Sequence, residues 1–289
     1  MAHNQLSTIE KQLQQIAEML LLNGTITECP GLIHGKMGVA VFFFHYTQYT
    51  DNTLFADYAI DLIGEMQQQI HANSPADYEK GIAGIGVGID YLIRHKLLVA
   101  TDDICDDLDH RMYRAVMYDP WQDLSLYDGL TGYGRYWISR LHHQTPSAQA
   151  KECLLYIIEQ IEKKWPNITE KEQNDVYCFL HDLHQISGFN VETRLIASLR
   201  ERELQSTDIN TRFPRLGNTF VGNIARTVQH DRYFNDILHD EIDLTLPQTP
   251  DPDMEKPFAS MGLLTGYAGE GMWRLTALNK TNTLWINLL

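Results

Sequence analysis

Two kinds of apolar pattern alternate along the chain. In the first kind, apolar residues recur at steps of three and four while the positions between them are polar. Residues 6–21 are an example, in which Leu6, Leu13 and Leu20 belong to one stripe. Such a stripe predicts an amphipathic surface helix. The same pattern occurs at residues 53–70, 102–116, 153–165, 193–204 and 232–242.

The second kind of segment is apolar or small around most of the helix circumference. Residues 39–49 and 84–93 carry one charged residue between them, Asp90, so helices there are expected to be buried on nearly all sides. Two glycines, three residues apart, precede or open four such segments: Gly35 and Gly38, Gly81 and Gly84, Gly129 and Gly132, and Gly266 and Gly269. Residues 176–188 and 215–228 are degenerate copies of the same pattern.

The glycine pairs form a repeat. The first three begin 46 and 48 residues apart, and the fourth begins 137 residues after the third, which is close to three further steps. Six buried helices that alternate with six amphipathic ones predict an inner ring wrapped by an outer ring. We therefore expect an all-α fold, an α/α toroid of six helical hairpins, as a single domain over residues 1–289. Glycines at the inner helix N-termini would let neighbouring backbones approach closely.

The repeated heads GLIHGKMG, GIAGIGVGIDYLI, GLTGYGRYWISRL and GLLTGYAGEG resemble those of the lanthionine synthetase C-like (LanC-like) family. The resemblance implies an α/α toroid which, in the cyclases, holds a zinc ion at its mouth. There the zinc activates a peptide cysteine for addition to dehydroalanine or dehydrobutyrine. The WCxG and CHG elements that hold this zinc are absent, and Ile33 stands where a cysteine would precede His34.

The resemblance therefore implies a protein of ribosomal-peptide maturation that binds a peptide at the mouth of the toroid without the usual zinc centre. The expected partner is a peptide substrate or another modification enzyme, and no cofactor is expected. Two other hypotheses stay open. One is an active thioether-forming cyclase with an altered metal site, and the other is a carbohydrate-active hydrolase that uses paired carboxylates, from Asp128, Glu79 and Glu270.

His34 is the first candidate catalytic residue. It stands just before an inner helix, where the helix dipole disfavours its protonation and a neutral imidazole could act as a base. The equivalent positions of other repeats hold Lys80, Asp128 and Thr265. Asp128 also has the place of a helix N-cap. The expected substrate-binding residues around the same opening are Glu79, Asp128, Tyr127, Tyr267 and Glu270, and His184 is also expected to bind substrate.

His181 is the second candidate catalytic residue, in the segment CFLHDLH. On a helix, Cys178, His181 and Asp182 fall within about a 100° arc, which makes a single-helix zinc site geometrically possible, with His184 farther round. The alternative is a buried cysteine that packs as a small hydrophobe beside hydrogen-bonded histidines. No metal ligand is assigned on this basis.

Charge and composition limit the partners. A formal net charge of −15 disfavours a nucleic-acid backbone and fits a basic or neutral peptide or a small molecule.

No run reaches the ~18 apolar residues of a membrane span, and no apolar signal region follows the N-terminus, which predicts a cytoplasmic protein. The four cysteines are widely spaced and indicate no disulfide framework. Residues 245–257, rich in proline and acidic residues, predict a non-helical excursion.

Overall fold

The computed structural model describes residues 2–71, 73–99, 102–142, 148–186, 213–217, 219–235, 260–278 and 281–289. These ranges are all-helical and contain no strand, apart from one isolated bridge between Ser260 and Gly266. None of the helices in these ranges combines the length and apolar character needed to cross a bilayer. The predicted helix at 193–204 and the predicted excursion at 245–257 lie outside the described residues.

Four of the expected amphipathic helices are confirmed. Each turns its apolar stripe inward: Leu13, Ile16 and Leu20 of the first are fully buried, while the glutamines and glutamates between them are mostly exposed. The bounds of these helices are α1 Ala2–Asn23, α3 Leu54–Gln69, α5 Asp106–Met117 and α7 Ala148–Lys164. A 3₁₀ turn, η1 (Asp102–Cys105), leads into α5, and a second, η2 (Trp165–Asn167), follows α7.

The glycine-headed segments and both degenerate copies form the other α-helices of the described ranges. Their bounds are α2 Lys36–Thr50, α4 Ile82–Arg94, α6 Leu130–Leu141, α8 Glu170–His184, α11 Phe220–Phe234 and α12 Tyr267–Ala277. In α2 every residue from Lys36 to Tyr46 is buried, as the absence of a polar face predicts. Of the amphipathic segment predicted at 232–242, residues 232–234 end α11, and residues 236–242 lie outside the described part.

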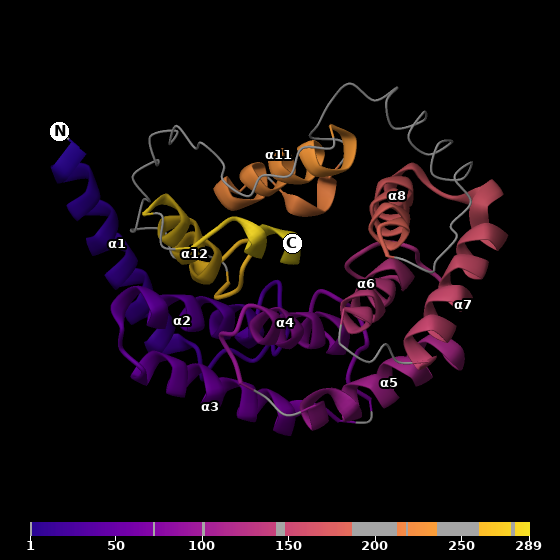
Figure 1. Cartoon of the computed structure of the whole chain (residues 1–289), viewed down its shortest axis with the longest axis horizontal. Coiled ribbons are helices and arrows are strands. Elements are labelled where there is room, and N and C mark those ends of the chain that lie inside the picture. The colour runs from indigo at the N-terminus through magenta and orange to yellow at the C-terminus, as the bar shows by residue number, and fades with distance from the viewer. Residues whose placement is uncertain are drawn as a thin grey trace.

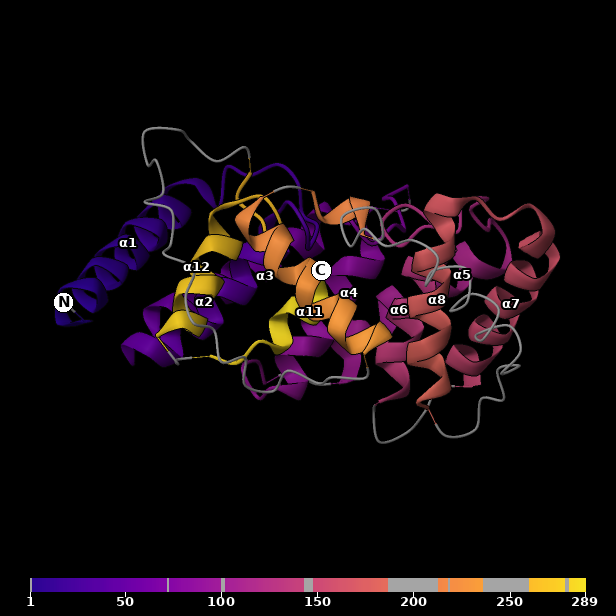
Figure 2. The same ribbon diagram turned by 90° about the horizontal axis from the view of Figure 1, so that it is seen from above.

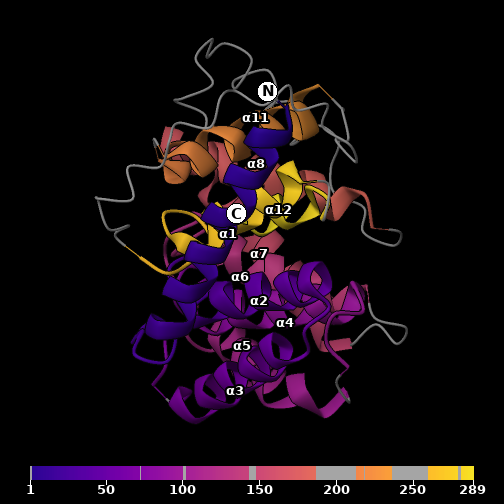
Figure 3. The ribbon, with the colours of Figure 1, turned by 90° about the vertical axis from the view of Figure 1, so that its left-hand side faces the viewer.

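The helices form two layers. The amphipathic helices pack on the buried ones, with α3 against α2, α7 against α6 and α1 against α12. The buried helices also pack on one another, as α12 does on α2, α4 on α6, and α6 on α8. Figure 1 shows the buried helices around the segment marked C, and Figures 2 and 3 also place this segment in the middle of the molecule.

The glycine heads work through close approach of backbone rather than through unusual torsion angles. The N-cap glycines of α2, α4, α6 and α12 all have extended backbone with negative φ and receive no side-chain cap. Instead, the first N–H of the helix donates to the carbonyl seven residues earlier, as Ile82 does to Pro75 (3.0 Å) and Leu130 to Asp123 (2.9 Å). The cap of α6 is therefore Gly129, and Asp128 does not cap this helix.

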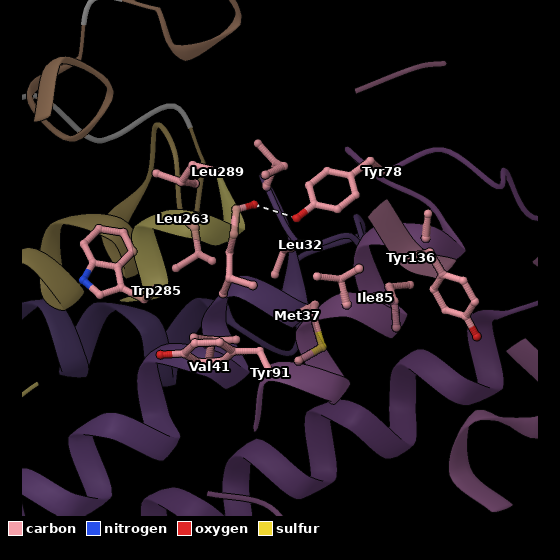
Figure 4. Packing of buried hydrophobic residues seen from close by; sticks show 14 of the residues in the cluster. Leu32, Met37, Val41, Tyr78, Ile85, Tyr91, Tyr136, Leu263, Trp285 and Leu289 are labelled. Atoms are coloured by element: carbon pink, nitrogen blue, oxygen red, sulfur yellow. Dashed lines mark hydrogen bonds between the residues drawn. The ribbon is translucent and has the colours of Figure 1, made fainter. Parts of the chain in front are cut away.

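The middle of the fold is filled by η4 (Leu284–Leu288) and Leu289. Trp285, Ile286 and Leu288 are buried among the inner helices. The Tyr78 hydroxyl donates to the Leu288 carbonyl (2.9 Å), and the guanidinium of Arg135 donates to that of Asn287 (2.6 Å). Figure 4 shows the Tyr78 bond beside the packed side chains of Leu263 and Trp285. Donor side chains from two repeats thus hold the carbonyls of this segment.

A histidine in the core makes stability depend on pH. His45 of α2 is 6% exposed, with Nε2 2.9 Å from the Tyr91 hydroxyl and Nδ1 3.1 Å from that of Thr281. Burial lowers the pKa of His45 from 6.5 to about 4, with a smaller contribution from His95. Between these two values the unfolded chain binds more protons than the folded one, so folding stability falls as the pH drops from 6.5 to 4.

We expect this histidine to contribute up to about 3 kcal/mol to the loss of stability over that interval, at 1.36 kcal/mol per unit of pKa. Urea unfolding at pH 7, 5.5 and 4.5, on the wild type and on His45→Gln, measures it. The variant is less stable at pH 7 but loses less free energy of unfolding on acidification. Parallel pH profiles for the two proteins would contradict the prediction.

Candidate functional site

The loops that precede the glycine-headed helices lie side by side at one end of the fold. Their backbones are joined directly: the Ile33 N–H donates to the Glu79 carbonyl (3.3 Å), Leu264 to Ile33 (3.2 Å), and Tyr78 to Tyr127 (2.9 Å). Residues 29–35, 75–81, 123–129 and 260–266 therefore form one surface. This brings equivalent positions of different repeats together, as the repeat predicts.

His34 lies at the centre of a chain of hydrogen bonds on this surface, which we call the His34 relay (Ser260, Thr265, His34 and Glu79). The imidazole Nε2 is 2.9 Å from the Glu79 carboxylate, and Nδ1 is 3.3 Å from the Thr265 hydroxyl. That hydroxyl is 3.1 Å from the Ser260 hydroxyl. The relay joins the first, second and last glycine heads along the chain.

The relay can accept and move a proton. Partial burial lowers the pKa of His34, and this effect outweighs the opposing charge of Glu79, so the ring is neutral near pH 7. The side chains of His34 and Glu79 are 26% and 19% exposed, which leaves both open to solvent. Lys80, mostly exposed, has its Nζ 3.8 Å from the Glu79 carboxylate. The His34 imidazole, which can act as a base, and the hydroxyl groups of Thr265 and Ser260 therefore lie together at a solvent-accessible position.

Next to the relay, the loop at 73–77 forms one wall of a groove of ≈ 650 Å³. We call it the acidic groove. Residues of α5 and of segment 118–133 form its other walls. Its charged side chains are four carboxylates and two guanidiniums, together with one histidine: Asp77, Asp107, Asp119, Asp128, Arg111, Arg114 and His110. The groove thus carries an excess of negative charge.

Two features of the acidic groove favour a cationic ligand with apolar parts. The pKa of Asp77 is raised, mainly by burial and further by the nearby charge of Asp128. A cation between these two carboxylates would relieve their repulsion. Tyr118 and Trp121, which also line the groove, are 76% and 58% exposed and offer ring faces to a ligand.

The segment CFLHDLH lies on α8 and faces a partly buried ionic cluster. Asp182 is bound by Arg232 (2.8 Å) and by the Tyr233 hydroxyl (2.9 Å). Burial alone would raise the Asp182 pKa, but the charge of Arg232 and the hydrogen bond from Tyr233 outweigh it and lower this pKa below its usual value. Burial strongly raises the pKa of the Cys178 thiol.

The structure does not gather the side chains considered as a zinc site into one cluster. Asp182 is paired with the Arg232 guanidinium, and Cys178 is buried. In the described ranges, no three His, Cys, Asp or Glu side chains come close enough together to hold a metal ion. His181 packs its ring edge-on against Tyr233 instead.

The other predicted site residues are dispersed. The Tyr127 hydroxyl points to the Leu289 carbonyl (3.4 Å) in the middle of the fold, and Tyr267 is buried. Glu270 binds Arg274 one turn along α12 (2.7 Å), and His184 is exposed at the end of α8. Of the predicted set, the His34 relay brings together His34 and Glu79, and Asp128 lies in the adjoining acidic groove.

Sequence reasoning did not assign a role to Asp77, Tyr118, Trp121 or Ser260. Asp77 precedes the second glycine head by four residues and lies in the loop that repeats along the chain, so its position was in principle recognisable. The place of Tyr118 and Trp121 depends on how α5 approaches this loop, which no local pattern encodes.

Comparison with models of known protein families gives no match, and comparison with curated proteins gives no significant match. In the part of the chain that the structure describes, the protein is therefore characterised only by its all-helical fold, its repeated glycine-headed helices and the polar groove beside their loops.

Proposed function

We propose that the chain is an α/α toroid of the LanC-like type and that it binds a basic peptide segment in the acidic groove, beside the His34 relay. The support for the architecture is the alternation of outer and inner helices and the shared loop geometry of four glycine heads. The observation that carries the function is the acidic groove itself, with four carboxylates against two guanidiniums and two exposed rings.

Each element of this groove suits a peptide. Lysine and arginine side chains would pair with Asp119 and Asp128, which are exposed at its walls. Their ammonium or guanidinium groups would also stack on the Trp121 ring. In this proposal the His34 relay acts on, or hydrogen-bonds to, a polar group of the bound segment, and recognition requires no metal.

We expect a fluorescein-labelled decapeptide with alternating lysines to bind the wild-type protein, as measured by fluorescence anisotropy at low salt. Removing two groove charges in Asp119→Asn/Asp128→Asn should weaken binding about tenfold, since each exposed charge pair contributes up to about 1 kcal/mol. Asp61→Asn is the matched control, because this carboxylate is exposed on α3 outside the groove. It should have little effect.

A glutamate version of the same decapeptide should not bind. The proposal fails if the lysine peptide does not bind the wild type. It also fails if the control and the double variant weaken binding equally, since long-range charge alone would then explain the affinity.

A second candidate is a carbohydrate-active hydrolase. It is favoured by one observation, the combination of exposed Trp121 and Tyr118 rings with the neighbouring carboxylates of Asp77 and Asp128. Binding of neutral oligosaccharides to the wild type, lost in Trp121→Ala but insensitive to salt, would favour this candidate over the peptide.

A further inference from the structure

A cavity of ≈ 290 Å³, lined mainly by apolar residues, opens between α3, α4 and α5, and we call it the anchor socket. Figure 1 shows α3 and α5 following one another beneath α4. Seven of its lining residues are aliphatic: Ile63, Met66 and Ile70 from α3 and its C-cap, Ile85 and Ile89 from α4, and Ile104 and Leu108 from η1 and α5. Only Gln67, Asp107 and Arg111 add polar groups to its wall.

The anchor socket adjoins the acidic groove. Asp107 and Arg111, one turn apart on α5, line both. Arg111 is fixed between them, because its guanidinium donates to the carbonyl of His71. A ligand that lies in the groove can therefore pass over this turn of α5 and place a side chain in the socket.

The size and chemistry of the socket select the kind of side chain. An apolar cavity of about 150 Å³ is enough to hold a benzene molecule. The socket is larger, and seven of its ten lining residues are apolar, so a phenylalanine or leucine side chain would bury apolar surface against them. The adjoining carboxylates favour positive charge in the same ligand, close to that side chain.

We propose that the peptide ligand carries one large apolar anchor residue, Phe or Leu, which enters the socket, next to lysine or arginine residues that lie along the acidic groove. This inference rests on the proposed function and deepens it by defining the peptide class. The occupant is a separate peptide, since charge complementarity in the adjoining groove favours a basic ligand, whereas this chain itself is strongly acidic.

The first test uses the wild-type protein and two labelled peptides. One has a single Phe followed by alternating lysines, and the other has Ala in place of Phe. We expect the Phe peptide to bind roughly tenfold to a hundredfold more tightly by fluorescence anisotropy, the range that burial of one large apolar side chain provides. Equal affinity of the two peptides overturns the socket inference and leaves the proposed function standing.

The second test fills the socket. Ile70→Phe enlarges a half-buried residue at its edge, while Ile60→Phe makes the same change at a 49% exposed position of α3 that does not line it. Ile70→Phe should abolish the advantage of the Phe peptide and leave the Ala peptide unaffected, and Ile60→Phe should change neither. The inference is overturned if Asp119→Asn/Asp128→Asn loses binding of both peptides while Ile70→Phe still binds the Phe peptide more tightly than the Ala peptide. No binding of either peptide to the wild type overturns the proposed function along with it.

Discussion

Gly84→Ala is expected to lower the free energy of unfolding by about 4 kcal/mol. Gly84 is the second glycine of the α4 head, and a Cβ built there would lie 2.0 Å from the carbonyl oxygen of Tyr78 and 3.2 Å from the Cβ of Leu32. The first contact is with backbone that is itself fixed, because the Tyr78 N–H donates to Tyr127. Neither the loop at Tyr78 nor the helix α4 can shift at low cost in free energy, so the added methyl group forces the loop away from the helix.

Gly64→Ala provides the matched control. Gly64 lies inside α3, and a Cβ there would meet nothing within 4 Å. This variant should be more stable than the wild type by about 0.5–1 kcal/mol, because alanine favours the helical state. Urea unfolding followed by circular dichroism measures both. A Gly84→Ala protein as stable as the wild type would show that the loop is not packed on α4 in this way.

Asp175→Ala is expected to cost about 3–5 kcal/mol, since it removes one partner of a buried ion pair. Asp175 of α8 is paired with Arg215, and their side chains are 8% and 10% exposed. Its second oxygen accepts the Leu126 N–H of the third loop (2.9 Å). The substitution leaves the Arg215 guanidinium, which also contacts Gln229 and the Phe213 ring, without its carboxylate partner, and it removes the acceptor of a buried amide.

Thermal and urea unfolding measure the loss, with Asp61→Ala as a surface control expected to stay within about 0.5 kcal/mol of the wild type. Asp175→Leu/Arg215→Met removes both charges and should recover at least half of the loss, because no unpaired guanidinium remains. If Asp175→Ala lies within 1 kcal/mol of the wild type, the pair is not what ties α8 to the third loop.

Much of the fold could be predicted because its signals are local. The steps of three and four in residues 6–21 and 53–70, and the glycine pairs, each depend on neighbours within two helical turns. The start of a helix was harder to predict in the degenerate copies of the repeat. The helix α8 begins at Glu170, six residues before the predicted segment, because Thr169 and Glu172 form a capping box in place of the glycine head.

The candidate site was predictable only in part. The repeat register predicted that His34 and Glu79 would share one opening, and their 2.9 Å contact agrees with it. Glu270 has a similar place in the last repeat, but it binds Arg274 on its own helix. This pairing at i and i+4 draws its side chain away from the shared opening. The anchor socket depends on the mutual packing of three helices, which no single segment encodes.

The central segment has a consequence for how the protein is made. The bond between Tyr78 and Leu288 joins residues 210 positions apart, and closing so long a loop is entropically costly and slow. As α2, α4 and α6 leave the ribosome, the segment 284–289, whose carbonyls later accept hydrogen bonds from Tyr78, Tyr127 and Arg135, has not yet been synthesised. The nascent protein therefore exposes a hollow apolar centre, and this stage of synthesis is the one at which aggregation competes with folding.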